Sequence, residues 1–348
     1  MTFHRETKIL LALTVLVSGA AFYVLNKNQS QGTAPEGIGD RTLPGFEAQM
    51  GTVDEVVLSG PEGQTTLRKI EGRWVVAERR NFPARQVQVN QLISGLGAAE
   101  KFSARTGEEK FFARLGLVDR YIEIAANSGD QKLTTLKTGD QFYSPTGEGV
   151  MTFTFDPATN RAWTIAGLPE VSIEPSFWLA PDLLSLSELR IKRVEVIIGE
   201  NPAWVISKEK PLSPGFVLEG ENSFQADPRA VNAAGMGATD LYFDDVLDLE
   251  GLDLFKVAEA RVETFDGLTV TMEFFDQDGL ILTSFFAVYD ESVLLSPETP
   301  TVLPDVPADG GAEAAALNQI WQGRVFQIPL QKLAEILKFR REFFRTTG

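Results

Sequence analysis

The pattern of apolar and polar residues first predicts a membrane anchor. From Ile9 to Leu25 the chain has seventeen residues without a charge, and a helix rising about 1.5 Å per residue would carry them across roughly 26 Å. Lys8 and Lys27 flank the run, and lysine side chains reach toward the membrane surface to complete a short span. We therefore expect residues 1–27 to be a cytoplasmic tail and a transmembrane anchor.

A cleaved signal peptide is the alternative for this segment, because Ser18-Gly19-Ala20-Ala21 offers small residues for cleavage. The apolar run continues to Leu25, however, where a signal peptide would turn polar. The pattern therefore favours an uncleaved signal-anchor over a cleaved signal or a buried helix of a cytosolic protein. Basic residues precede the run, so the positive-inside rule places the amino terminus in the cytoplasm and the bulk of the chain outside.

A flexible stalk is predicted next. Residues 28–45, "NQSQGTAPEGIGDRTLPG", are polar, rich in glycine and proline, and without an apolar period. We expect the folded part to begin near Phe46.

The folded part opens with a strand pattern followed by a helix pattern. "VDEVVLSG" and "QTTLRKIEGRWVVAERR" alternate in the manner of two strands. "FPARQVQVNQLISGLGAAEKF", from Phe82 to Phe102, then places apolar residues at helical spacing. These are Val89, Leu92, Ile93, Leu96 and Ala99.

The same order of patterns occurs a second time. "IKRVEVIIGE" and "PAWVISKE" predict strands, and "FQADPRAVNAAGMGATDLYF" predicts a helix capped by Asp227-Pro228. Phe82 and Phe224 are 142 residues apart, as are Asn90 and Asn232. Trp204 then takes the strand position that Trp74 has in the first copy.

The predicted fold class is therefore α+β, with an N-terminal transmembrane helix followed by two tandem repeats. Residues 46–190 form the first repeat and residues 191–348 the second, each an antiparallel sheet with a packed helix. Hairpin turns are predicted at residues 127–130 and 276–279. The Pro/Gly/Ala-rich residues 296–316 are predicted to be a disordered insertion in the second repeat.

Composition removes several classes of function. The formal net charge is −16, which disfavours nucleic acid as a partner, since such a surface repels phosphates. The chain has no cysteine and a single histidine, His4. Thiol catalysis, disulfides, Cys/His zinc sites and histidine-based triads are thereby excluded from the remainder, and no lipoprotein can form.

The motifs that suggest chemistry have simpler explanations. Phosphate loops open a helix with glycine, whereas Gly95-Leu96-Gly97 and Gly235-Met236-Gly237 come late in a helical period. Ser207-Lys208-Glu209-Lys210 fits Ser-x-x-Lys, but it follows a strand and runs into Pro211, which is typical of a charged turn.

Two residue groups leave a binding role open. Five acidic residues between Asp244 and Asp253 gather the oxygen ligands that calcium prefers, although their spacing fits no EF-hand loop, and whether they bind a cation stays open. Tryptophan side chains are suited either to a sugar-binding groove or to the core, and the core is favoured. They are Trp74, Trp163, Trp178, Trp204 and Trp321. We assign no catalytic, cofactor-binding or metal residue and expect no cofactor.

The order of four short motifs resembles DUF4340, a bacterial family of unknown function. The motifs are Trp74, Phe82-Pro83-Ala84, Val89-Asn90-Gln91-Leu92 and Leu115-Gly116-Leu117. The resemblance covers most of the chain from about Val53, including "LLSLSELR" between the repeats. In that family the helix opens with Ala-Asp; Ala226-Asp227 keeps this pair, whereas the first copy has Ala84-Arg85.

The resemblance implies a protein anchored in the bacterial inner membrane with its bulk in the periplasm. Similar proteins are often encoded beside ABC transporter components of the gliding-motility type. The expected function is therefore a non-enzymatic accessory or scaffold subunit of an envelope ABC transport complex, with its permease or extracytoplasmic subunits as partners. The alternatives are a periplasmic module that binds envelope polysaccharide or peptide, and an envelope hydrolase that uses two carboxylates.

Overall fold

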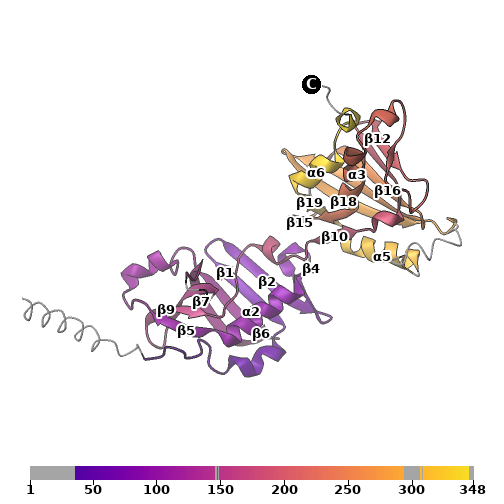
Figure 1. Cartoon of the computed structure of the whole chain (residues 1–348). Coiled ribbons are helices and arrows are strands. Elements are labelled where there is room, and N and C mark those ends of the chain that lie inside the picture. The colour runs from indigo at the N-terminus through magenta and orange to yellow at the C-terminus, as the bar shows by residue number, and fades with distance from the viewer. Residues whose placement is uncertain (1–35, 146, 148, 294–305, 308, 345–348) are drawn as a thin grey trace, which may run out of the picture. The chain divides into compact units, whose positions relative to one another are not determined.

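The computed structural model describes residues 36–145, 147, 149–293, 306–307 and 309–344 (Figure 1). By the density of contacts, the described residues up to Gln64 form one compact unit together with Asn90–Ile173, and Thr65–Val89 form a second unit with the residues from Glu174 onward. The predicted anchor at residues 9–25 lies outside the described residues. Within the described part, no helix is long and apolar enough to cross a membrane.

The first large sheet has nine antiparallel strands in the order β4-β3-β2-β1-β6-β7-β8-β9-β5. Their bounds are β1 Glu55–Gly60, β2 Gly63–Ile70, β3 Arg73–Val76, β4 Phe82–Pro83, β5 Glu100–Ala104, β6 Ile122–Ser128, β7 Gln131–Tyr143, β8 Val150–Asp156 and β9 Arg161–Ala166.

The second large sheet has eight antiparallel strands in the order β13-β12-β11-β16-β17-β18-β19-β15, and a two-stranded sheet pairs β10 with β14. Their bounds are β10 Asp182–Ser185, β11 Ile191–Ile198, β12 Asn201–Ser207, β13 Val217–Leu218, β14 Asp240–Tyr242, β15 Asp245–Asp248, β16 Phe255–Thr264, β17 Leu268–Gln277, β18 Leu280–Tyr289 and β19 Arg324–Gln327. The turns β6–β7 and β17–β18 lie where the sequence predicts them.

The two large sheets have a similar order of elements. In each, a two-residue strand, β4 or β13, leads into a helix, and the last strand lies beside an edge strand that follows that helix: β9 beside β5, and β19 beside β15. They differ in that four strands precede α2 but three precede α3, and β14, the first strand after α3, pairs with β10 in the small sheet. Trp74, in β3, and Trp204, in β12, each lie in the strand next to the edge strand that precedes the helix, which agrees with their predicted equivalence. The first sheet has one more strand, β2, between β3 and β1, whereas β12 lies directly beside β11.

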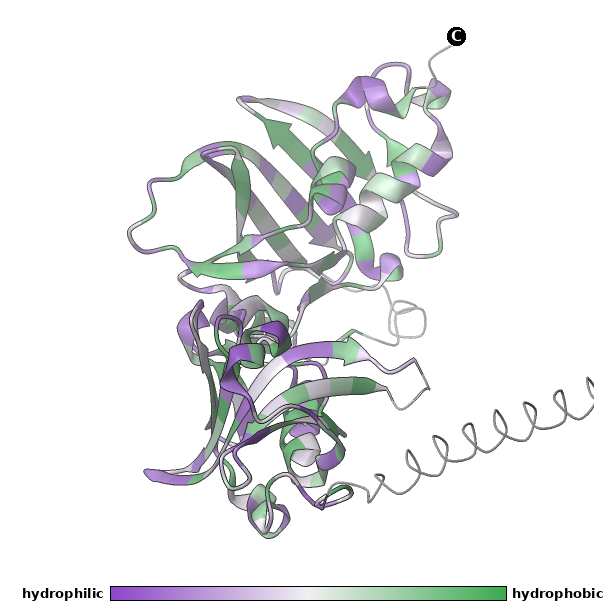
Figure 2. Ribbon diagram, turned by 90° about the vertical axis from the view of Figure 1, so that its left-hand side faces the viewer, coloured by the Kyte–Doolittle hydropathy of each residue, from purple (hydrophilic) through white to green (hydrophobic). Residues whose placement is uncertain are grey.

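The predicted α+β class is wrong, because large antiparallel sheets dominate the described chain and helices are few. The α-helices are α2 Gln86–Ala98, α3 Pro228–Gly237, α5 Gly310–Trp321 and α6 Leu330–Ile336. Strands of ten to thirteen residues, such as β7 and β16 to β18, account for the difference. Along β16, buried Ala258, Ala260 and Val262 alternate with charged residues (Figure 2), so one face of the strand is in the core.

Two segments predicted to be irregular are ordered where the structure describes them. Residues 39–42, at the end of the predicted stalk, pair with the edge strand β5: the Gly39 N–H donates to Lys101 O and the Thr42 N–H to Ala99 O, both at 2.8 Å. Helix α5 begins at Gly310, inside the segment 296–316 predicted to be disordered. Asp309 caps it by accepting the Ala312 N–H at 2.9 Å, and alanine-rich sequence sustains the helix.

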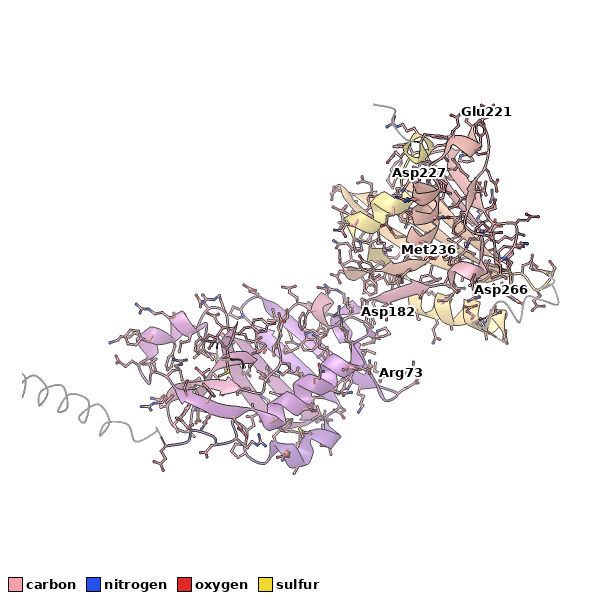
Figure 3. The ribbon with its side chains drawn as sticks, in the orientation of Figure 1. Arg73, Asp182, Glu221, Asp227, Met236 and Asp266 are labelled. Carbon is pink, nitrogen blue, oxygen red and sulfur yellow. The ribbon has the colours of Figure 1, made fainter. Side chains whose placement is uncertain are left out.

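The two equivalent helices begin differently. The Asp227 carboxylate accepts the Arg229 N–H at 3.0 Å and caps α3, as the Asp-Pro pair predicts (Figure 3). In α2 the corresponding Arg85 cannot accept this bond. Its Nε instead donates to Leu179 O at 2.8 Å, and its backbone N–H donates to Trp178 O. Arg85 therefore fixes the segment at Leu179 rather than capping a helix.

Removing the α3 cap should destabilise the second unit. Asp227→Ala leaves an N–H of the first helical turn without its acceptor, so we expect the free energy of unfolding to fall by about 1 kcal/mol. Urea unfolding of the full chain, followed by tryptophan fluorescence, measures this loss. Asp253→Ala, which removes an exposed carboxylate outside any helix, is the control. An equal loss in both variants would mean that the cap contributes nothing specific.

Candidate binding groove

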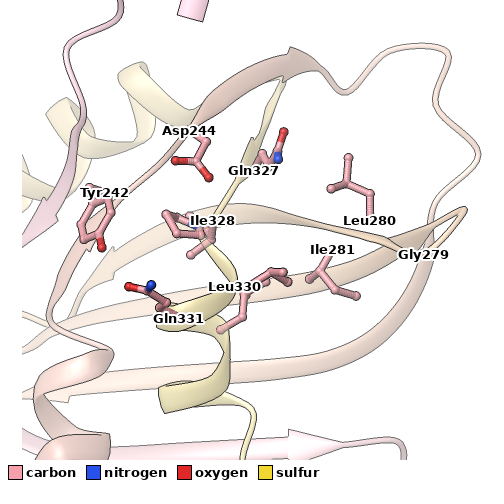
Figure 4. A pocket seen from close by; sticks show the side chains of 11 residues that line it. Tyr242, Asp244, Gly279, Leu280, Ile281, Gln327, Ile328, Leu330 and Gln331 are labelled. Carbon is pink, nitrogen blue, oxygen red and sulfur yellow. The ribbon is translucent and has the colours of Figure 1, made fainter. Parts of the chain in front are cut away.

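The candidate site is an open groove in the second unit, between the β17–β18 turn, the end of β19 and the start of α6 (Figure 4). Its volume of about 550 Å³ is within the range of small-ligand and side-chain pockets. The apolar lining residues are Leu280, Ile281, Ile328, Pro329, Leu330 and Leu333, and the others are Tyr242, Asp244, Gly279, Gln327 and Gln331.

The apolar lining includes leucine side chains that face solvent. Leu330 is 80% exposed and Leu280 is 39% exposed, while Ile328 and Leu333 form a buried floor. Large exposed apolar side chains that meet at a concave surface are typical of binding sites, because a ligand removes them from water.

Asp244 supplies the charge of the groove. Its side chain is exposed, and among the described residues its carboxylate has no hydrogen-bond or ion-pair partner. Its backbone N–H donates to Gln327 O at 2.8 Å, which fixes the residue at the end of β19. The amides of Gln327 and Gln331 and the phenol of Tyr242 are the other polar groups of the lining.

Other members of the acidic cluster Asp244–Asp253 are engaged by arginine. Arg79 donates two parallel hydrogen bonds to Asp245, at 2.7 and 2.8 Å. The hydrogen bond with Asp245 is the largest reason that the pKa of Arg79 is raised. Arg80 pairs with Asp248 at 2.6 Å. Within the described residues no group of side chains is arranged to hold a metal ion, and the paired carboxylates balance arginine charge instead.

A buried arginine with two carboxylates lies elsewhere in the second unit. Arg190 Nη2 contacts Asp266 at 2.6 Å and Glu313 at 2.8 Å, and both pairs are doubly hydrogen-bonded. Asp266, in the turn between β16 and β17, is labelled in Figure 3. Burial alone lowers the pKa of Arg190, but the hydrogen bonds that Arg190 donates to Glu313 and Asp266 outweigh burial and raise it. The cluster joins α5 to the sheet and is occupied by its own charges.

The Ser-x-x-Lys motif has no catalytic geometry. Ser207 is the last residue of β12 and pairs with Val217 and Arg193, so Lys210 is not one helical turn away. The buried amine is that of Lys208, which contacts Glu188 Oε1 at 2.8 Å and lies 4.4 Å from the centre of the Phe216 ring. Its charge is matched by Glu188 and the ring, which is a structural role.

The glycine pairs lie inside α2 and α3 rather than at the start of either helix. A Cβ atom at Gly95 would collide with Pro169, and one at Gly97 would collide with Met50. At Gly235 the obstacle is Phe216. These glycines allow close packing, and they do not open a helix as the glycines of a phosphate loop do.

All five tryptophans are buried, with exposures of 0 to 2%. None can stack on a sugar, so core packing was the correct interpretation. The residues that sequence reasoning missed are the groove leucines, Leu280 and Leu330. Nothing in the local pattern of apolar positions marks them as neighbours, since 50 residues separate them.

Comparison with known proteins gives a match to the model of a family described as "Domain of unknown function (DUF4340)", over residues 74–266. The match covers more than half of the chain. No curated protein and no solved structure matches the chain.

Proposed function

The chain belongs to the DUF4340 family, whose function is unknown, and from that premise we propose that it is a non-enzymatic accessory or scaffold subunit of an ABC-type envelope transport complex. In this proposal residues 9–25 anchor it in the bacterial inner membrane, and the two units face the periplasm. Its partners are the permease or the extracytoplasmic subunits of the transporter.

The observation that carries the proposal is the contrast between the groove and the ionic clusters. Arg79, Arg190 and Lys208 are each matched by carboxylates of the fold. The groove, in contrast, offers exposed leucines and the Asp244 carboxylate, which has no partner among the described residues. This combination suits the binding of another polypeptide. Such a surface is what a scaffold subunit needs.

The alternatives receive less support. A polysaccharide module would use exposed tryptophans beside a cleft, whereas Trp163, Trp178 and Trp321 are buried. A hydrolase needs two carboxylates that face each other in a pocket. Asp244 is the single carboxylate among the residues that line the groove, and two smaller pockets of the described residues have one carboxylate each.

Affinity purification from gently solubilised membranes tests the proposal. Leu330→Glu places a charge in the apolar groove, so we expect the recovery of transporter subunits to fall roughly tenfold, which corresponds to about 1.4 kcal/mol of binding free energy. Leu212→Glu is the matched control, because Leu212 is 64% exposed and lies outside the groove. Recovery of no transporter subunit with the unmodified chain, under any mild detergent, would contradict the proposal.

A further inference from the structure

We propose that the groove binds an extended, positively charged peptide segment, in which a lysine or arginine side chain lies beside an apolar one. The inference rests on the proposed scaffold role, because it names the class of segment that the same groove holds. Three features of the described residues lead to it: an uncovered length of strand, the apolar lining and the charge.

The backbone beside the groove favours an extended ligand. β18 begins at Leu280, but β19 pairs with it only at Leu282 and Thr283. Within the described chain, Leu280 and Ile281 therefore have a strand partner on the β17 side alone. After Pro329 the chain turns away into α6. Ile328 and Pro329 follow β19 without pairing with β18 and line the groove together with Leu280 and Ile281. A peptide can lie between these two segments and hydrogen-bond to the unpaired start of β18, as in recognition by strand addition.

The side chains around this strand edge select an apolar residue. Leu280 and Leu330 project from opposite sides of the groove in Figure 4, and both are exposed. Ile328 and Leu333 lie buried beneath them. Successive side chains of an extended peptide alternate in direction. One apolar side chain can therefore contact Ile328 and Leu333 while its neighbours point outward.

The charge around the groove selects a cation. Asp244 is exposed and has no partner in the described part of the chain. Asp276, near the end of β17, and Asp278, in the β17–β18 turn, add negative charge beside the groove. Lys332 Nζ lies 5.8 Å from the centre of the Tyr242 ring, and its charge is partly neutralised by Glu335 at 3.6 Å. A chain of net charge −16 adds a long-range field of the same sign, which draws basic segments and repels acidic ones.

Two labelled peptides test the inference. The full chain in phosphatidylcholine nanodiscs is titrated into fluorescein-labelled Lys-Leu-Val-Leu-Arg, or into Glu-Leu-Val-Leu-Glu, and anisotropy gives each Kd. We expect the basic peptide to bind at least about tenfold more tightly, because the acidic one meets like charge. Asp244→Asn should weaken the basic peptide by about three- to fivefold, the range of a partly exposed ion pair, and should reduce the preference between the peptides.

The matched control is Asp253→Asn, which removes an exposed acid outside the groove and should leave both values of Kd unchanged. Equal binding of the two peptides, or an equal effect of Asp244→Asn and Asp253→Asn, would overturn the inference. Its failure is separable from that of the scaffold role. If transporter subunits co-purify but the basic peptide does not bind, only the peptide inference fails. If the peptide binds but no subunit is recovered, the scaffold role fails.

Discussion

Replacing Arg190 with leucine should lower the free energy of unfolding of the second unit by about 3–5 kcal/mol, the cost of breaking a buried ion pair by removing one partner. The Arg190 side chain is 5% exposed, and those of Asp266 and Glu313 are 3% and 18% exposed. Without the guanidinium, two carboxylates face each other away from water. Hydrogen exchange of the second unit in the full chain, measured with increasing urea, reports the loss for its strands and for α5.

Adding Asp266→Asn and Glu313→Gln to Arg190→Leu should recover part of the stability, because the two substitutions remove the carboxylate charges that the lost guanidinium no longer balances. Arg120→Leu is the control, because Arg120 pairs with Asp119 and Asp140 at the surface. The free energy of unfolding of this variant should be unchanged. A loss equal to that of Arg190→Leu would mean that the buried cluster has no special weight.

The sequence predicts the local elements well where a single period applies. The helical spacing of Val89, Leu92 and Leu96 predicts a buried helix face, and all three residues are fully buried in α2. The Asp227 cap is equally local, since a side chain and the next two residues decide it. Such features depend on contacts within one helical turn.

The sequence predictions fail at one turn and in one segment whose composition suggests disorder. "QTTLRKIEGRWVVAERR" predicts one strand, but Glu71 and Gly72 have φ of 49° and 81° and turn the chain between β2 and β3. A Glu-Gly pair at positive φ suits a two-residue hairpin turn. The first sheet therefore has one more strand before its helix than the second. In the same way, the proline-rich start of residues 296–316 hid the Asp309 cap and the helix after it.

Neither the groove nor the buried Arg190 cluster can be predicted from local sequence patterns, because both bring together residues that are far apart in the chain. Arg190 meets Asp266 and Glu313 across 76 and 123 residues of sequence, and Asp244 meets Leu280 through the sheet order of β15, β19 and β18. In a chain with 48 acidic residues, no local pattern selects which carboxylate is paired and which stays free. That choice depends on strand register, which periodicity does not fix when long-range partners are unknown.

Truncating Phe326 should have the other large effect. Phe326, in β19, is fully buried and packs its ring against three others, with centroids 5.2 Å from Phe243, 5.7 Å from Phe285 and 5.8 Å from Phe82. Phe326→Ala opens a cavity among these rings, and we expect the free energy of unfolding of the second unit to fall by about 3–5 kcal/mol. Urea unfolding of the full chain measures the loss.

The neighbouring strand offers a matched control for this truncation. Phe286, in β18, is 56% exposed, so Phe286→Ala removes the same atoms without leaving a cavity and should change stability by about 0.5 kcal/mol or less. Phe326→Leu should fall between the two, because it keeps part of the buried volume. Gln327, the last residue of β19, and Ile328, which follows it, line the groove, so Phe326→Ala should also weaken binding of the basic peptide. Equal losses in Phe326→Ala and Phe286→Ala would show that the aromatic cluster does not hold β19 in place.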